Sequence, residues 1–142
     1  MNTILLTGIA TVLVFGTVVL VHELGHFLAA RRFGIWVQEF SIGFGPALWS
    51  RVKKGTRYSI RLFPLGGYNL LPGEDPYTDE QDEQNPPRPA HSPYDPRAPK
   101  LPAAVQGRLF DEASPWQRFF VILSGALMNF VLGYLVLVLL LS

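Results

Sequence analysis

The feature that most constrains this chain is a pair of histidines at the end of a long apolar run without a charge. The run extends from Ile4 to Val21, and the residues His22-Glu23-Leu24-Gly25-His26 follow it directly. Side chains four residues apart project from one face of a helix, and two neutral imidazoles in that arrangement can bind Zn²⁺. The glutamate beside the first histidine can then act as a base toward water. The sequence therefore predicts metal ligands at His22 and His26 and a catalytic base at Glu23.

A structural role for the two histidines is the alternative, because histidine pairs on soluble helices often only cap the helix or form hydrogen bonds. By chance, an H-E-x-x-H pattern would arise on the order of once in a few hundred sequences of this composition. In an apolar helix, however, ionisable side chains are costly and usually mark functional sites. The apolar context therefore favours metal binding.

The composition indicates a membrane protein. Of the 142 residues, 49% are hydrophobic, and they are concentrated in two blocks at the ends of the chain. Ile4 to Val21 alone spans roughly 27 Å as a helix, and the helical pattern continues to Arg31 and Arg32. The second block, Phe119 to Leu141, has 23 residues without a charge and is long enough to cross a bilayer. Because Met1-Asn2-Thr3 lacks the basic residues of a secretory signal, we expect the first helix to be retained.

Charge and residue content exclude several classes of function. The net charge is only +1, and basic residues do not alternate with aromatic ones, so no nucleic-acid partner is expected. The chain contains no cysteine, which excludes disulfides, thiolate metal ligands and cysteine nucleophiles. Histidine and carboxylate side chains remain as the strong metal ligands.

The basic residues predict an orientation in the membrane. They follow the first apolar block and precede the second, at Arg31, Arg32, Arg51, Lys53, Lys54, Arg57, Arg61 and Arg118. By the positive-inside rule we expect a multi-pass protein of the cell inner (cytoplasmic) membrane, with the central loop cytoplasmic and both termini extracytoplasmic. His26 lies about 7 Å of helix rise before the arginine pair, within reach of water. A solvated face or contact with anionic lipids also accounts for these charges.

We predict a membrane α-helical fold with a small β-element, divided into four segments. A transmembrane helix carrying the histidines covers 4–33, a membrane-associated β-region covers 36–72, and a second transmembrane helix covers 116–141. Between the last two, 73–113 is expected to be a flexible, cytoplasmic, proline-rich acidic loop, with six acidic residues from Glu74 to Glu83. His91 lies within this loop and is expected to be solvent-exposed rather than a ligand.

The β-region is predicted from a period of two. Tyr58, Ile60 and Leu62 alternate with polar residues, and Lys53-Lys54-Gly55-Thr56 supplies a hairpin turn. We expect an earlier strand that ends at Gly43-Phe44-Gly45-Pro46, and an interruption of the later strand at Pro64, Gly66 and Gly67. Such a small apolar sheet is expected to rest against the helices or to dip into the membrane interface.

Several motifs follow one another along nearly the whole chain. They are His22-Glu23-Leu24-Gly25-His26-Phe27, Phe40-Ser41-Ile42-Gly43-Phe44-Gly45-Pro46, Gly55-Thr56 with Tyr58, Pro64-Leu65-Gly66-Gly67-Tyr68, Gly73-Glu74-Asp75, and Gly125 with Asn129-Phe130. Together they resemble the N-terminal part of the site-2 protease family, the intramembrane zinc metalloproteases, and in particular the bacterial branch that trims membrane-spanning anti-sigma factors.

The resemblance implies a function in regulated intramembrane proteolysis of single-span membrane proteins. His22 and His26 would bind Zn²⁺, Glu23 would be the general base, and the β-region would present an edge strand to the substrate. Asn129 matches a family position, and the alternative for it is a hydrogen bond between packed helices, with Gly125 allowing their close approach.

The departures from the family concern the third metal ligand. The family completes its zinc site with an aspartate in a Leu-Asp-Gly motif on a later membrane helix, and many members carry PDZ domains before it; this sequence contains neither. Ala126 also stands where proline is common, and the loop is longer than usual. Catalytic zinc usually takes three protein ligands, and Asp75, His91, Asp111 or Glu112 could substitute only if the loop folded back.

We therefore expect the N-terminal portion of a protease, whose missing C-terminal helices supply an aspartate. The end of the chain directly after Leu139-Leu140-Leu141, without a polar anchor, favours continuation of the natural protein. Two other functions stay open. One is a catalytically incomplete paralogue that binds or regulates membrane proteins, and the other is a membrane-anchor or transporter fragment in which H-E-x-x-H is incidental.

Overall fold

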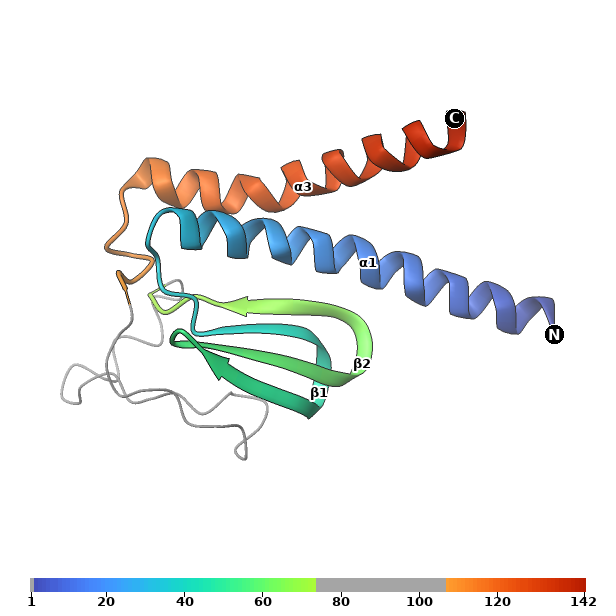
Figure 1. The fold of residues 1–142 in the computed structure, drawn as a ribbon, viewed down its shortest axis with the longest axis horizontal. Coiled ribbons are helices and arrows are strands. Elements are labelled where there is room, and N and C mark those ends of the chain that lie inside the picture. The colour runs from blue at the N-terminus through green and yellow to red at the C-terminus, as the bar shows by residue number, and fades with distance from the viewer. Residues whose placement is uncertain (1, 74–106) are drawn as a thin grey trace.

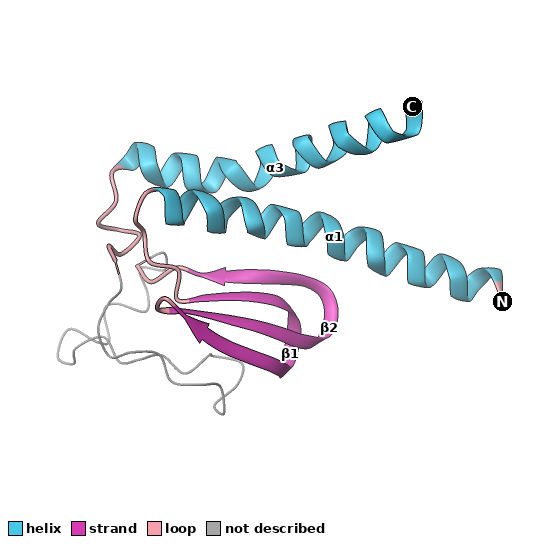
Figure 2. Cartoon of the chain, in the orientation of Figure 1, coloured by secondary structure: helices cyan, strands magenta, loops and turns pink. Residues whose placement is uncertain are grey.

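Two long helices and one folded hairpin make up the protein in a computed structural model that describes residues 2–73 and 107–142 (Figure 1). Helix α1 spans Thr3–Arg32, strand β1 Glu39–Lys53, strand β2 Thr56–Leu70 and helix α3 Pro115–Leu141. The two helices lie next to each other, and the hairpin lies along the opposite side of α1 from α3 (Figure 2). Both helices are long and apolar enough to cross a membrane, so the predicted combination of apolar helices and a small β-element is confirmed. Most of the predicted acidic loop, including Asp75 and His91, lies outside the described residues.

The helix backbones come into direct contact where both carry glycine. A Cβ atom added to Gly25 would lie 2.9 Å from the Cα atom of Gly125, which is closer than real side chains approach. Small residues allow helix backbones to meet in this way. The two helices run in opposite directions, so both chain termini lie at the same end of the pair, and the helices diverge toward that end (Figure 1). Large apolar side chains near these ends are exposed, and this surface is suited to lipid or to further helices.

Residues 107–114 lead into α3 and pack against the other end of α1. Arg108 donates a hydrogen bond to the carbonyl oxygen of Phe33 at 2.7 Å, and its backbone pairs with that of Ile35. Phe110 and Ala113 are buried in the core. Ser114 then caps α3, because its hydroxyl accepts from the backbone N–H of Gln117 while the Gln117 side chain accepts from the Ser114 N–H.

β1 and β2 form an antiparallel hairpin whose turn is the predicted one. Lys54 and Gly55 both have positive φ angles, 51° and 74°. Two left-handed residues in succession are what a tight hairpin turn of type I′ requires. The indole N–H of Trp36 donates to the carbonyl oxygen of Gly55 at 2.8 Å and thereby ties the turn to the segment before β1.

The predicted end of the first strand at Gly43–Pro46 and the predicted interruption at Pro64–Gly67 are wrong, because both strands continue through these residues and bend. Gly43, Gly45 and Gly66 have φ angles of 86°, 84° and 139°, which let the backbone bend within each strand, and the pairing register shifts at these bends. Residues 39–42 consequently pair with 57–60 on one side and with 67–70 on the other. The sheet has its rows in the order 47–53, 56–61, 39–42 and 67–70.

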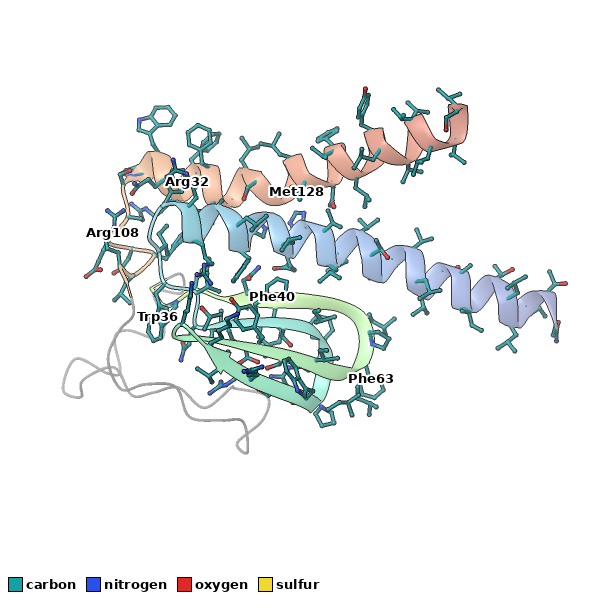
Figure 3. All side chains as sticks on the ribbon, viewed as in Figure 1. Arg32, Trp36, Phe40, Phe63, Arg108 and Met128 are labelled. Carbon is teal, nitrogen blue, oxygen red and sulfur yellow. The ribbon has the colours of Figure 1, made fainter. Side chains whose placement is uncertain are left out.

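The bends point along α1 toward its N-terminus (Figure 1). A Cβ atom added to Gly16 would lie only 2.7 Å from the carbonyl oxygen of Pro64, so the bend of β2 touches the middle of the apolar helix. Gly16 is separated from Arg32 by about 24 Å of helix rise. Figure 3 shows Phe63 at this bend, at the opposite end of the hairpin from Trp36.

The core lies where the end of α1, the sheet and the start of α3 meet. Phe27 of α1 packs on Phe40 and Tyr58 of the sheet, with ring centroids 5.0 Å and 5.9 Å apart. The buried apolar residues of this cluster are Phe27, Ala30, Ile35, Val37, Phe40, Leu71, Phe110, Ala113 and Val121. It holds the sheet and both helices in one unit.

The other face of the sheet buries a charged network. The side chains of Glu39, Arg57 and Arg61 are fully buried, and the Glu39 carboxylate lies 3.2 Å from Arg57 and 2.7 Å from Arg61. Ser59 and Tyr68 also donate hydrogen bonds to this carboxylate. Burial raises the pKa of Glu39, but the hydrogen bonds from Arg61, Ser59 and Tyr68 and the charge of Arg61 outweigh it, so the pKa is lowered.

Glu39→Gln is expected to lower the free energy of unfolding at pH 7 by about 3 kcal/mol, because it removes the charge between two buried guanidinium groups. Since folding lowers the pKa of Glu39 from 4.5, this stabilisation is complete above pH 4.5 and is lost as pH falls through the folded-state value. Thermal unfolding in detergent between pH 7 and pH 3 measures the difference between the two proteins, which should narrow below pH 4.5. Glu112→Gln changes an exposed carboxylate and serves as the control. An equal effect of both substitutions would contradict the prediction.

Candidate metal centre

Helix α1 directs both histidines toward α3. Their rings meet edge to face, with centroids 4.7 Å apart. A Cβ atom added to Gly125 of α3 would lie 2.6 Å from Nε2 of His26 and 2.8 Å from Nε2 of His22. The two Nε2 atoms therefore converge on the space that the missing side chain of Gly125 leaves open.

His26 is fixed in one tautomer by α3. Its Nδ1 atom lies 2.7 Å from the carbonyl oxygen of Val121. Because a carbonyl oxygen only accepts, Nδ1 must carry the hydrogen, and in the neutral ring Nε2 keeps its lone pair. A histidine that donates through one nitrogen to a carbonyl and offers the other is the usual form of a zinc ligand.

His22 also has a neighbour on α3 beside its Nδ1 atom, Asn129. The Nδ2 atom of Asn129 lies 3.3 Å from Nδ1 of His22, while Oδ1 of Asn129 is buried with no hydrogen-bond partner in 2–73 or 107–142. The oxygen and nitrogen of a side-chain amide can be exchanged by a rotation of about 180°. In that orientation Oδ1 of Asn129 faces Nδ1 of His22 and accepts its hydrogen, so Oδ1 is no longer unpaired. Both imidazoles then present a lone pair at Nε2, so the donor set fits a zinc ion.

A third ligand is not found in the part of the chain that the structure describes. Within 2–73 and 107–142 there is no group of three or more histidine, aspartate or glutamate side chains that could hold a metal. Asp111 accepts a hydrogen bond from the backbone N–H of Glu112, and Glu112 accepts one from that of Leu109. These two carboxylates lie in the segment before α3 and do not complete the histidine pair.

Glu23 points to a different neighbour, the last row of the sheet. The Nδ2 atom of Asn69 donates to the main-chain oxygen of Glu23 at 2.7 Å and to its carboxylate Oε2 at 2.9 Å. Asn69 is not among the site residues that the sequence predicts. The only signal was a polar residue between Tyr68 and Leu70 in an apolar strand, and it does not reveal a partner 46 positions earlier.

Comparison with known proteins gives several matches. The sequence pattern of peptidase family M50 matches residues 10–142. A putative zinc metalloprotease of Vibrio cholerae is 38% identical over 133 residues, which are 92% of this chain and 24% of the relative. The regulator of sigma-W protease RasP of Bacillus subtilis is 54% identical over 70 residues, 49% of this chain and 17% of the relative. The regulator of sigma E protease of Haemophilus influenzae is 37% identical over 122 residues, 84% of this chain and 22% of the relative. The chain thus spans about a quarter or less of the length of these relatives.

Gly125→Ala is expected to abolish zinc binding, because the added Cβ atom would occupy the space between the two Nε2 atoms. Gly133→Ala is the matched control on the same helix, since no atom of the part of the chain that the structure describes lies within 4 Å of a Cβ atom there. Competition with a chromophoric zinc chelator in detergent measures the affinity. Retention of zinc affinity by the Gly125 variant would show that the metal, if bound, lies elsewhere.

Asn129→Leu is expected to weaken zinc binding by about 10- to 100-fold, because it removes the group that orients His22. Asn129→Asp keeps an oxygen that can accept from Nδ1 of His22 and should bind zinc nearly as well as the wild type. The same chelator competition measures both variants. Equal affinity of the wild type and the leucine variant would assign Asn129 to helix packing alone.

Proposed function

This chain belongs to peptidase family M50, and from that premise we propose that it is the N-terminal part of an intramembrane zinc endopeptidase that cleaves membrane-spanning proteins. The observation that carries the proposal is the convergence of two Nε2 atoms at Gly125, with both Nδ1 atoms directed at partners on α3. A site-2 type metalloprotease needs these groups, and the Vibrio cholerae relative of this chain is named a putative zinc metalloprotease.

The residues of this chain divide the chemistry between two sides of α1. His22 and His26 would hold the ion on the side of α3, and zinc, when bound, would supply Lewis-acid activation of water and of the peptide carbonyl. Glu23 would accept a proton from the attacking water and pass it to the leaving amine nitrogen. Because Oε2 already accepts from Asn69, the other carboxylate oxygen, Oε1, is the one left for the proton.

The third protein ligand is proposed to be an aspartate from a further helix outside the described residues. Two imidazoles leave a catalytic zinc short of one protein ligand. The diverging ends of α1 and α3 carry exposed apolar side chains, which supports packing against additional helices.

The position of the sheet supports a membrane-spanning substrate. If α1 crosses the bilayer with Arg31 and Arg32 at the cytoplasmic surface, the bend at Pro64 reaches the depth of Gly16, well inside the apolar region. A helical substrate keeps its carbonyl groups hydrogen-bonded and must unwind before hydrolysis. The outer row of the sheet, residues 67–70, offers the released backbone replacement hydrogen bonds.

Glu23→Gln is the decisive variant for this proposal. It is tested on a model transmembrane substrate in two preparations, this chain alone and this chain coexpressed with the remaining part of the Vibrio cholerae relative. We expect cleavage only by the wild type in the coexpressed preparation, with at least a 100-fold loss in the variant, because the amide cannot accept the proton. Zinc content measured in parallel should be unchanged.

The second candidate function is a catalytically incomplete protein that binds membrane substrates or relatives. The absence of a third ligand among the described residues is the observation that favours it. Substrate capture without cleavage in both preparations, by the wild type and by the Glu23 variant alike, would support this function and reject the protease.

A further inference from the structure

Asn69 connects the proposed base to the sheet through a single amide nitrogen. Nδ2 carries two hydrogens, and the structure gives it two acceptors, the main-chain oxygen of Glu23 at 2.7 Å and Oε2 of the same residue at 2.9 Å. The main-chain oxygen is fixed by the helix, so the first bond sets the plane of the amide. The second hydrogen is thereby aimed at the carboxylate.

The amide leaves one carboxylate oxygen available. Oε2 of Glu23 accepts from Asn69, whereas Oε1 accepts no hydrogen bond from the residues that the structure describes. A carboxylate held at one oxygen cannot rotate freely, so the direction of the other oxygen is restricted. Such preorientation of a proton acceptor is one way in which an enzyme lowers the entropic cost of reaction.

Asn69 also belongs to the outer edge of the sheet. It is opposite Phe40 in the register, and the carbonyl oxygen of its neighbour Leu70 accepts from the N–H of Gln38. Because main-chain groups alternate in direction along an antiparallel strand, the N–H and C=O groups of Asn69 point to the other side. No strand pairs with residues 67–70 on that side within the described ranges.

The Asn69 amide that joins the sheet to the helix lowers the stability of the fold. Among the described residues, its Oδ1 atom is buried without a hydrogen-bond partner, and an isolated buried acceptor destabilises a fold. A serine or threonine hydroxyl carries a single hydrogen, whereas the Asn69 amide nitrogen has one for each of the two Glu23 oxygens. The asparagine therefore fits a group whose task is to orient the carboxylate.

We propose that Asn69 is the positioning residue of the base. Its hydrogen bond holds Oε2 of Glu23 so that Oε1 faces the reacting atoms, and it does so from the strand whose open edge receives the unwound substrate. Seating of the substrate and orientation of the base are thereby mechanically coupled. The inference rests on the proposed function, because it assigns Asn69 a role in that same reaction.

The test is Asn69→Leu in the coexpressed protein that cleaves the model substrate. Leucine has nearly the same size but no donor, so we expect kcat to fall by about 10- to 100-fold while KM changes by less than about twofold. Two readouts do not depend on turnover. Zinc content should equal that of the wild type, and affinity for a labelled transmembrane peptide, measured in the Glu23→Gln background, should be unchanged.

Tyr58→Phe is the matched control. It removes another side-chain hydrogen bond between α1 and the sheet, the 3.0 Å bond that Arg31 donates to the Tyr58 hydroxyl, at a distance from Glu23 along the helix. If Asn69 only joined the sheet to the helix, both variants would lose stability and activity alike. We expect the Tyr58 variant to keep wild-type kcat.

Four outcomes would overturn the inference: full activity of the Asn69 variant, an equal loss in the Tyr58 variant, loss of zinc, or loss of peptide affinity that accounts for the lower rate. A wild-type coexpressed protein that does not cleave rejects the proposed function, and the role of Asn69 falls with it. A wild-type protein that cleaves, with an unaffected Asn69 variant, rejects the role of Asn69 alone.

Discussion

The backbone contact between Gly25 of α1 and Gly125 of α3 sets the distances on which the metal centre depends. Because neither residue carries a side chain, the helices approach closely enough for Val121 and Asn129 to reach the two imidazoles. At Gly125 the same absence also leaves the space onto which both Nε2 atoms converge. One pair of glycines thus determines helix packing, histidine orientation and room for the ion, and these properties cannot be varied separately.

Helix α1 lies between the two partners that complete its motif. The histidines face α3, whereas Glu23 is held by Asn69 of β2, so ligand geometry depends on helix packing and base geometry depends on the sheet. The sheet is in turn fixed by the contact of Phe27 with Phe40 and by the buried network around Glu39. Figure 3 shows Phe40 directed from the sheet toward α1. Charged residues remote from the metal centre therefore stabilise the placement of the base.

Local signals in the sequence were sufficient for the helices, the turn at Lys54-Gly55 and the spacing of His22 and His26, because each depends on a few neighbouring residues. The sequence predicts a strand end at Gly43 and an interruption at Gly66, where the strands instead bend, because the same local pattern of glycine and proline occurs at both kinds of site. The burial of Arg57 and Arg61 and the contact of Asn69 with Glu23 could not be foreseen. Both arise from segments that only the folded-back hairpin brings together.

The open edge of the sheet has a physical consequence at the depth where it lies. If α1 spans a bilayer, the outward main-chain N–H and C=O groups of Asn69, which no strand of the described residues pairs, lie beside a helix whose surroundings are hydrocarbon, and such groups are tolerated there only with water or protein partners. Peptide hydrolysis requires water at that depth, and an unwound substrate requires hydrogen-bond partners. Under the proposed function, an extended substrate docking along this edge beside Glu23 would supply the hydrogen-bond partners that the edge itself needs.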